Sequence, residues 1–236
     1  MGEKEKPKFN VRGAKSLVDE VLGLAYFHPE DDEHKTPPIY SHFVPGKGPL
    51  VVAVGENASG KSFFRRCVQA VCKACDIECM SISAEGRRQV AYSPWLVFAY
   101  GDEDCMSTGY NSVGTVLTGI NTCLKRDNKH VIFWDEPDLG MSDNCAAGVG
   151  QRIKEFVGQA SDKTVASIVV SHSRALLQQL VDVDHHFLVF GKERTDTLQE
   201  WVDRPVIPRD LDQVNNEGIT RFRRLSRLMK ARGIKD

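Results

Sequence analysis

The feature of this chain that most constrains its fold is a glycine-rich segment of eight residues. It reads Gly55-Glu56-Asn57-Ala58-Ser59-Gly60-Lys61-Ser62 and matches the pattern GxxxxGK[ST] at every fixed position. A run of apolar, mostly β-branched residues, Leu50 to Val54, precedes it, and a helical pattern follows from Lys61. A loop of this kind joins the end of a buried strand to the start of a helix. The segment therefore predicts an α/β fold, with the strand Leu50 to Val54 inside its sheet.

Further apolar runs alternate with helical patterns along the chain. The runs predict core strands at Leu50 to Val54, Ile77 to Ile82, Trp95 to Tyr100, His130 to Trp134, Val165 to Val170 and Phe187 to Phe190, with an edge strand at Leu198 to Val202. Helical spacing predicts helices at Ala14 to Ala25, Lys61 to Cys75, Ser112 to Lys125, Cys145 to Gln159 and Arg174 to Val181. Strands that alternate with helices predict a mostly parallel sheet with helices on both faces.

The character of the sequence divides the chain into three parts. Residues 1–48 are polar and irregular, residues 49–203 hold the predicted sheet, and residues 204–236 end in a basic amphipathic pattern. A chain of 236 residues is long enough for one main domain with a substantial core. We therefore expect a peripheral N-terminal segment, a central core and a C-terminal segment.

The glycine loop, as we call Gly55–Ser62, has the chemistry of a phosphate-binding site. Its glycines allow a tight curl in which successive backbone N–H groups point at phosphate oxygens, and the positive end of the following helix adds to the attraction. Lys61 would reach the β- and γ-phosphates of a nucleotide, and the Ser62 hydroxyl would bind Mg²⁺. The alternative is a chance match in a surface loop. The residues expected to bind nucleotide are Gly55, Glu56, Asn57, Ala58, Ser59, Gly60, Lys61, Ser62 and Phe63.

Two adjacent carboxylates, Asp135 and Glu136, follow the predicted strand His130 to Trp134. Chemistry in an open α/β sheet lies at the carboxyl ends of the strands. Asp135 would bind Mg²⁺ through its water shell, and Glu136 could accept a proton from the water that attacks the γ-phosphate. An ordinary strand-to-turn exit, Asp-Glu-Pro, is the alternative.

His172 ends the next predicted strand, Val165 to Val170, within the sequence Val-Val-Ser-His-Ser. The same edge of the sheet would bring it beside the acidic pair, where it could bond to the γ-phosphate or to the attacking water. A satisfied histidine at the end of a strand is the alternative. His185 and His186 lack this context, and we expect them to be structural.

Together these three segments resemble the ABC class of ATPases, in which a Walker A loop, an Asp-Glu pair and a switch histidine occur in this order on successive strands. On this resemblance Gly55–Ser62 corresponds to Walker A, the pair Asp135-Glu136 to Walker B with its catalytic glutamate, and His172 to the switch histidine. The segment that begins with this pair is most similar to DNA-repair and chromosome-maintenance members. The resemblance covers Leu50 to Gly191 and implies a P-loop NTPase fold that binds ATP and Mg²⁺ and hydrolyses ATP.

Members of this class also carry a signature segment, LSGGQ in typical cases, that opens a helix and contacts ATP held by a second subunit. Met106 to Asn111 lies in the corresponding place, just before the helical pattern from Ser112. The resemblance implies that Ser107 and Gly109 contact ATP across a homodimer that forms with ATP. Thr108 departs from the usual glycine, and a plain turn that caps the helix is the alternative.

Two further features of the class have candidate positions without an assignment. Gln89 lies in the interval of the glutamine that senses the γ-phosphate. Tyr40 and Phe43 precede the first core strand, where an aromatic residue would stack on adenine, but a hydrophobic residue there also suits ordinary packing.

The C-terminal segment carries a run of cations without an acid. They are Arg221, Arg223, Arg224, Arg227, Lys230, Arg232 and Lys235. The apolar residues between them have helical spacing, at Ile219, Phe222, Leu225 and Met229. These cations could bind the phosphates of DNA or RNA. Alternatively, the apolar stripe docks on the core and the charges are solvated.

Composition excludes several other classes. The formal net charge is −1, which predicts no general attraction to nucleic acid or membrane, and no apolar run reaches the roughly 20 residues that a membrane span needs. We expect a soluble cytoplasmic protein with reduced cysteines. Cys72, Cys75 and Cys79 could belong to a zinc site, but their helical spacing with Cys67 favours packing.

These features predict an Mg²⁺-dependent ATPase head that dimerises around ATP, with Glu136, Lys61 and His172 as catalytic residues and Ser62 and Asp135 as metal ligands. A DNA-associated process is the favoured role, and an unidentified partner protein is also possible. A nucleotide-dependent switch that hydrolyses ATP slowly is the main alternative. A P-loop kinase for small molecules and an AAA-type motor rank below it.

Overall fold

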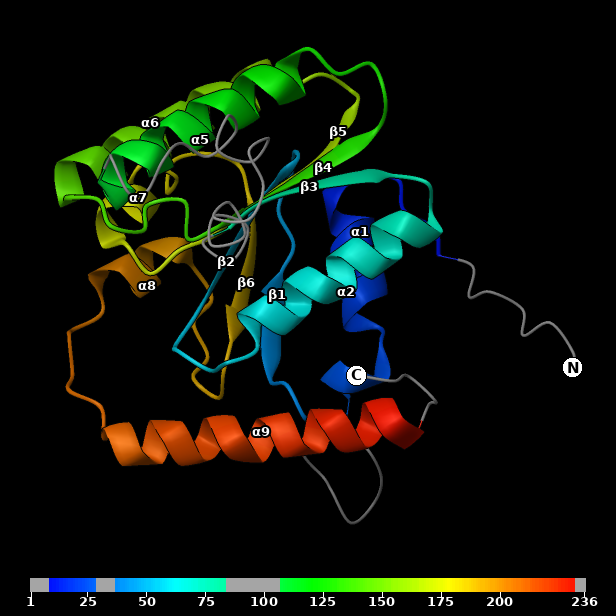
Figure 1. Cartoon of the computed structure of the whole chain (residues 1–236), viewed down its shortest axis with the longest axis vertical. Coiled ribbons are helices and arrows are strands. Elements are labelled where there is room, and N and C mark those ends of the chain that lie inside the picture. The colour runs from blue at the N-terminus through cyan, green and yellow to red at the C-terminus, as the bar shows by residue number, and fades with distance from the viewer. Residues whose placement is uncertain (1–8, 29–36, 84–106, 232–236) are drawn as a thin grey trace, which may run out of the picture.

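The computed structural model describes residues 9–28, 37–83 and 107–231. Its centre is a six-stranded sheet with the order β1-β6-β2-β5-β4-β3, in which only the β1–β6 pair is antiparallel (Figure 1). The strands are β1 (Ser41–Val44), β2 (Leu50–Gly55), β3 (Glu78–Ser83), β4 (His130–Asp135), β5 (Thr164–Val170) and β6 (His186–Phe190). The predicted α/β class with a mostly parallel sheet is confirmed.

Helices cover both faces of the sheet. They are α1 (Ala14–Leu22), α2 (Lys61–Ala74), α5 (Thr108–Leu124), α6 (Asp143–Gln159), α7 (Arg174–Gln178), α8 (Leu198–Asp203) and α9 (Leu211–Ala231), with a 3₁₀ turn at Ala25–Phe27. Helices α1 and α2 lie on one face, α5, α6 and α7 lie on the other, and α9 runs across one end of the molecule (Figure 1). Parallel strands need such crossover helices, because each connection must return to the same end of the sheet.

Side chains of β2 alternate between two separate cores. Val51 and Ala53 belong to the cluster beneath α1 and α2, whereas Leu50, Val52 and Val54 belong to the cluster beneath α5, α6 and α7. All five are fully buried. Because a strand with helices on both faces has no solvated side, it is apolar at every position. This explains why Leu50 to Val54 is a continuous apolar run.

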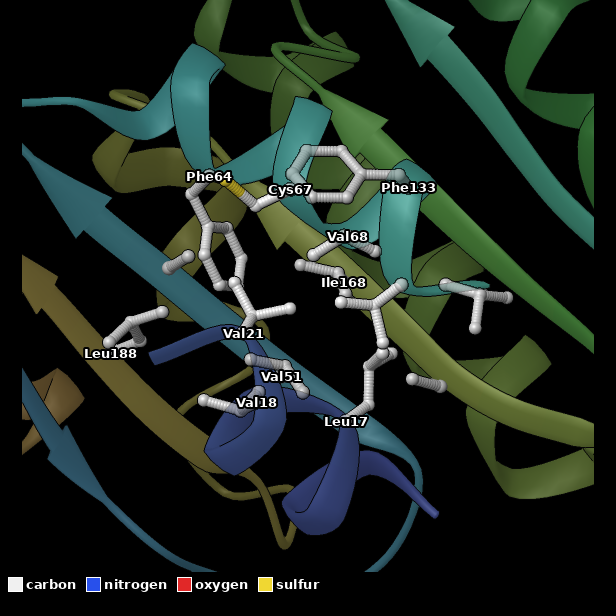
Figure 2. Close-up of a cluster of buried hydrophobic side chains, with 14 of the residues drawn as sticks. Leu17, Val18, Val21, Val51, Phe64, Cys67, Val68, Phe133, Ile168 and Leu188 are labelled. Atoms are coloured by element: carbon white, nitrogen blue, oxygen red, sulfur yellow. The ribbon is translucent and has the colours of Figure 1, made fainter. Parts of the chain in front are cut away.

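The first core joins α1 to α2 across the middle of the sheet (Figure 2). Leu17, Val18 and Val21 of α1 meet Phe64 and other residues of α2, and all four of these side chains have no exposed surface.

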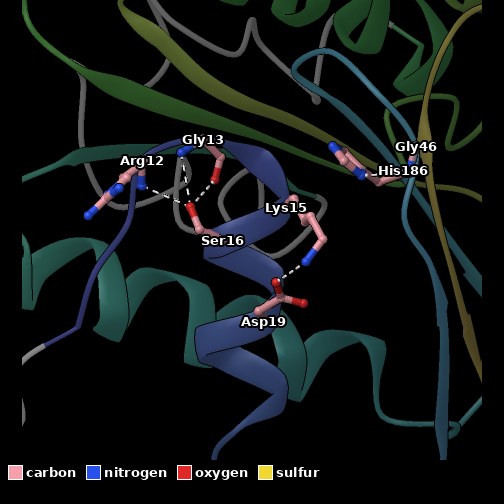
Figure 3. Close-up of polar contacts among 7 residues, drawn as sticks. All are labelled: Arg12, Gly13, Lys15, Ser16, Asp19, Gly46 and His186. Carbon is pink, nitrogen blue, oxygen red and sulfur yellow. Dashed lines mark hydrogen bonds and ion pairs between the residues drawn. The ribbon is translucent and has the colours of Figure 1, made fainter.

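The sequence at the start of α1 stabilises this helix. The Ser16 hydroxyl accepts hydrogen bonds from the backbone N–H groups of Arg12 and Gly13 at 2.8 and 3.0 Å (Figure 3).

Strand β1 was not predicted. It pairs Ser41 with Phe190 and Val44 with Phe187 at the antiparallel edge. The strand is short and only partly buried, so its sequence carries little of the apolar signal that marks the central strands. Nearby, the backbone N–H of Gly46 donates to His186 Nδ1 at 2.9 Å (Figure 3).

Most of the predicted elements are confirmed, with one clear error. Five predicted core strands match β2 to β6 to within one residue at each end. The predicted strand Leu198 to Val202 is wrong, because this segment forms helix α8. Thr197 caps this helix by accepting a hydrogen bond from Glu200 N at 3.2 Å, and the buried apolar residues occupy positions i, i+3 and i+4. The predicted strand Trp95 to Tyr100 lies outside the described residues.

The described part of the chain shows where most of the cysteines lie and whether it contains a helix that could span a membrane. Cys67 and Cys72 are buried in the core beneath α2, and Cys75 and Cys79 are partly buried against it. In residues 9–28, 37–83 and 107–231, no helix has the length and hydropathy needed to cross a bilayer.

We expect helix α1 to be essential for stability, although it lies before the first core strand. Leu17→Ala should lower the free energy of unfolding by about 2–5 kcal/mol, because it removes a fully buried side chain. Leu211→Ala, at a position that is 79% exposed, should change it by less than about 0.5 kcal/mol. Urea unfolding of both variants measures the difference, and equal effects would contradict the structure.

Candidate functional site

The glycine loop has a backbone that its sequence makes possible. Three of its residues have positive φ: Gly55 at 152°, Ala58 at 58° and Gly60 at 114°. A Cβ atom on Gly55 would lie 2.5 Å from the carbonyl oxygen of Phe190, and one on Gly60 would lie 2.8 Å from Ile39 Cγ2. Side chains are therefore excluded at both glycines, by dihedral angle and by space. The loop is a compact turn from the end of β2 into the start of α2.

Lys61 points back across the glycine loop. Its ammonium donates to the backbone carbonyls of Gly55 at 2.7 Å and Glu56 at 2.9 Å. Burial lowers the pKa of Lys61 to about 8, while the nearby carboxylates of Glu136, Glu56 and Asp135 act in the opposite direction. At neutral pH the loop therefore encloses a positive charge that is already largely removed from water.

Ser59 provides a second polar group inside the glycine loop. Its side chain is 4% exposed, and its Oγ has no hydrogen-bond partner among the described residues. A buried hydroxyl without a partner costs about 1–3 kcal/mol. An acceptor that enters the loop would remove this cost.

The other predicted loop residues differ in their surroundings. Ser62 is exposed at the start of α2. The ring of Phe63 instead packs edge-on against Tyr26, with 4.9 Å between ring centroids.

Asp135 lies at the end of β4, and Arg65 connects it to α2. Asp135 Oδ2 is 3.4 Å from Arg65 Nε, and Arg65 Nη1 donates to Ser83 Oγ at 3.0 Å and to Ser81 Oγ at 3.4 Å. The buried guanidinium thus joins α2 to the ends of β3 and β4. Sequence analysis did not single out Arg65. Its signal was the spacing of four residues after Lys61, which puts both side chains on one face of the helix.

Glu136 has a strained backbone. Its φ is 51°, in the left-handed region, and its N–H donates to the carbonyl of Val170 at 2.8 Å. Such a conformation in a residue other than glycine costs on the order of 1–3 kcal/mol, and surrounding structure must hold it. Here the pairing of β4 with β5 does so. The turn directs the Glu136 carboxylate toward His172, with 3.6 Å between Oε1 and Nε2.

His172 lies between the glycine loop and the acidic pair, because β5 is inserted between β2 and β4 in the sheet. Burial, followed by the positive charge of Lys61, lowers the pKa of His172 to about 4. The ring is therefore neutral at neutral pH. The adjacent Ser171 hydroxyl donates to Asp138 Oδ1 at 2.8 Å and so ties the turn after β5 to the turn after β4.

The signature-like segment packs on the turn that follows the acidic pair. A Cβ atom on Gly109 would lie 2.7 Å from the carbonyl oxygen of Gly140, and the Ser112 hydroxyl is 2.9 Å from the carbonyl oxygen of Leu139. Ser107 is exposed, and its Oγ accepts a hydrogen bond from Tyr110 N at 3.3 Å. Because Ser107 caps α5, the helix begins one turn earlier than the predicted start at Ser112. Met106 and Gln89 lie outside the described residues.

A cleft of about 830 Å³ separates the glycine loop from α9. Glu56, Asn57 and Ser59 line one wall, together with Tyr40. The facing residues of α9 are Asp212, Gln213, Asn216, Glu217, Thr220, Arg221 and Arg224. Sequence analysis did not predict this cleft, because nothing in the C-terminal segment indicates where its helix docks.

One ion pair and one close approach connect the C-terminal segment to the glycine loop. Arg204 pairs with the Glu56 carboxylate at 2.5 Å and lies over the ring of Trp201 at 3.4 Å. A Cβ atom on Gly218 of α9 would lie 3.4 Å from the Ala58 Cβ, which is ordinary van der Waals contact. The loop and the helix therefore approach each other directly.

The predicted apolar stripe of α9 divides into two parts. Leu225 is buried, and Met229 packs against the same core. Ile219 and Phe222 are instead 41% and 70% exposed. The helix therefore docks on the core through its C-terminal half, while its middle lies beside the glycine loop.

His185 and His186 contact the backbone, in agreement with the structural role expected for them. His186 accepts from Gly46 N through Nδ1, and its Nε2 lies 3.2 Å from the carbonyl oxygen of Gly48. His185 Nδ1 is 2.6 Å from the carbonyl oxygen of Val183. In the described part of the chain, no three His, Cys, Asp or Glu residues are grouped as a metal site would require.

Comparisons of the chain with protein-family models, with curated proteins and with solved structures found no match. The carboxyl edge of the sheet brings together the glycine loop, the acidic pair and His172. Its signature-like segment packs nearby on the Gly140 turn, and α9 faces the loop.

We expect His172 to titrate far below an ordinary histidine. Its ring signal in NMR should move with a midpoint at about pH 4 instead of 6.5, because burial and Lys61 disfavour its charged form. The folded state is then favoured above pH 6.5 by this group, and that contribution falls as the pH falls toward 4. His172→Gln identifies the signal. A midpoint at 6.5 would show that the ring is solvated.

Proposed function

We propose that this chain is an Mg²⁺-dependent ATPase of the ABC type. The observation that carries the proposal is the convergence of a glycine loop, its lysine and an Asp-Glu pair at one edge of a parallel sheet. A loop with the full GxxxxGK[ST] pattern and positive φ at Gly55 and Gly60 suits the phosphates of a nucleotide. The unpartnered Ser59 hydroxyl and the buried ammonium of Lys61 are donors that phosphate oxygens would satisfy.

Ser62 and Asp135 are the residues that would hold Mg²⁺, and hydroxyl and carboxylate oxygens suit that ion. The metal would supply positive charge to offset that of the β- and γ-phosphates. Arg65 already contacts Asp135, so this carboxylate is oriented before any ligand arrives.

Glu136 is the proposed general base. A water oxygen attacks the γ-phosphorus, the bond to ADP breaks, and the proton of the water passes to the Glu136 carboxylate. His172 is neutral and 3.6 Å from this carboxylate, so its ring can orient the water or the γ-phosphate by a hydrogen bond without neutralising the base. Lys61 stabilises the negative charge of the phosphates.

We propose that the active form is a dimer with ATP at its interface. The support is the signature-like segment, where Ser107 is exposed at the start of α5 and Gly109 packs on the turn that follows the acidic pair. Tyr110, 64% exposed, adds an aromatic surface beside Ser107. Ser107 and Gly109 would then contact the nucleotide of the partner subunit.

We also propose a DNA-associated role, and the support for it is the set of exposed cations on α9. Arg223, Arg227 and Lys230 are solvated and lie on a helix whose middle lies beside the glycine loop. Contacts of these residues with phosphates of DNA would bring the nucleic acid close to the nucleotide site.

A switch that binds ATP and hydrolyses it slowly is a second candidate. The contact between Arg65 and Asp135 favours it, because a guanidinium competes with Mg²⁺ for the same carboxylate. Turnover measurements separate the two functions.

The decisive variants are Lys61→Ala and Glu136→Gln. Lys61→Ala should abolish binding of Mg-ATP, whereas Glu136→Gln should bind it normally and hydrolyse it at least about 10²-fold more slowly, since a general base contributes about that much. Calorimetry measures binding, and phosphate release measures turnover. Glu155→Gln, on the exposed surface of α6, is the matched control and should keep both. Full turnover by Glu136→Gln would exclude Glu136 as the base, and slow turnover by the unaltered protein would favour the switch.

Assembly can be tested with the same variant. Light scattering coupled to size exclusion should show Glu136→Gln as a monomer without nucleotide and as a dimer with Mg-ATP, because bound ATP then persists at the interface. Ser107→Arg, introduced into this variant, should bind ATP and stay monomeric. If Glu136→Gln stays a monomer in every condition, the proposed dimer is contradicted. If the variant with both Ser107→Arg and Glu136→Gln still dimerises with Mg-ATP, Ser107 does not lie in the dimer interface.

A further inference from the structure

Helix α9 forms the wall of the cleft that faces the glycine loop. Seven of its residues line this cleft, and its Gly218 lies close to Ala58 of the loop. The pair between Arg204 and Glu56 fixes the chain just before α9 to the same loop. Side chains of α9 are therefore within reach of any ligand that extends from the glycine loop into the cleft.

Arg221 has an unusual position in this wall. It is half-buried, yet it makes no hydrogen bond or ion pair with any described residue. The acid one turn before it, Glu217, is 3.8 Å from Arg209 and also accepts a hydrogen bond from Gln213. Burial lowers the pKa of Arg221, while Glu217 and the Tyr40 hydroxyl act in the opposite direction. A guanidinium that loses water without gaining a partner is costly, and an anion would remove the cost.

Other charges around the cleft show what kind of anion would fit. The positive charges of Arg221 and Lys61 repel each other. Burial is the main cause of the lowered pKa of Lys61, and this repulsion lowers the pKa as well, whereas three nearby carboxylates raise it. Arg224 lines the same wall, and the unpartnered Ser59 hydroxyl belongs to the opposite one. Cations and a free hydroxyl that converge from two walls suit a ligand with several negative charges in a row, as in a polyphosphate.

Three of the five acids that line the cleft lie near an arginine. Glu56 is paired with Arg204, Glu217 lies near Arg209, and Glu193 is 3.6 Å from Arg204. The other two, Asp210 and Asp212, lie at the start of α9, where Asp210 Oδ1 accepts hydrogen bonds from the backbone N–H groups of Asp212 and Gln213. These contacts reduce the negative charge that would oppose an anion beside Arg221.

We propose that Arg221 contacts the phosphates of a nucleotide bound by the glycine loop of the same chain, so that α9 is one wall of the nucleotide site. This inference rests on the proposed ATP binding and adds to it a second phosphate contact, supplied in cis by the C-terminal helix. The guanidinium presents several N–H donors in a plane and matches two oxygens of a phosphate at once. Lys61 and Arg221 would then both be attracted to the phosphates of the ligand, and this attraction would offset their mutual repulsion.

The test compares Arg221→Gln with Arg66→Gln. Arg66 is an exposed arginine of α2 that does not line the cleft. Calorimetry should show that Arg221→Gln binds Mg-ATP and inorganic tripolyphosphate about tenfold or more weakly, as expected for the loss of a charged hydrogen bond, whereas Arg66→Gln binds both within about twofold of the unaltered protein. The salt dependence of ATP binding should also become shallower for Arg221→Gln alone, because one phosphate contact is lost.

A structural effect is separated by two further measurements. The melting temperature without nucleotide should be nearly the same for both variants, because Arg221 makes no hydrogen bond or ion pair with a described residue that its loss would break. Arg221→Lys keeps the positive charge and should restore part of the affinity for tripolyphosphate.

Each of the following results would overturn the inference or the function on which it rests. Unchanged or tighter binding of ATP by Arg221→Gln would show that α9 does not contact the phosphates, or that it obstructs the site. A loss confined to duplex DNA would assign Arg221 to nucleic acid. If the unaltered protein does not bind Mg-ATP, the proposed function itself is wrong. If Lys61→Ala loses ATP binding and Arg221→Gln keeps it, only the role of Arg221 is wrong.

Discussion

The pairing of β2 with two parallel neighbours is the constraint on which the rest of the structure depends. β5 lies on one side and β6 on the other, with Ala53 opposite Val170 and Gly55 opposite Phe190. This register brings the ends of the three strands to one edge. It also places the carbonyl of Phe190 so close to Gly55 that only glycine fits there. The shape of the loop and its position beside His172 therefore have a common origin in the sheet.

Charge is the second constraint, and it is concentrated at this edge. Lys61 and Arg65 lie on one face of α2, and each faces a group at the end of a strand: Lys61 the carbonyl of Gly55, and Arg65 the carboxylate of Asp135. Arg221 approaches from outside the sheet. Burial keeps these cations partly dehydrated, and a low dielectric strengthens their attraction for an anion. The strained backbone of Glu136 and the neutral ring of His172 lie at the same edge. Both features cost folding free energy, and they occur where we propose that ATP is hydrolysed.

Much of the fold was predictable because the strong signals were local. The apolar runs identified five strands, since a strand with helices on both faces has no polar side. The fixed positions of the glycine loop identified the turn into α2, since few residues allow such a turn. Prediction failed where the signal was weak or ambiguous. The edge strand β1 depends on its pairing with β6. The segment at Leu198 is too short for its pattern to separate a strand from a helix, and its apolar spacing of i, i+3 and i+4 together with the cap at Thr197 favours the helix.

The candidate site divides in the same way. By itself, the sequence determined which residues end each strand: the glycine loop after β2, Asp135 and Glu136 at β4, and His172 just beyond β5. These follow from residue type and spacing along the chain. Only the tertiary structure decided that Arg65 holds Asp135, that the Gly109 segment packs on the Gly140 turn, and that α9 faces the glycine loop. The reason is that each of these contacts joins side chains from separate elements. Their meeting depends on how the helices dock on the sheet, and docking is set by the packing of the two cores and not by any local pattern.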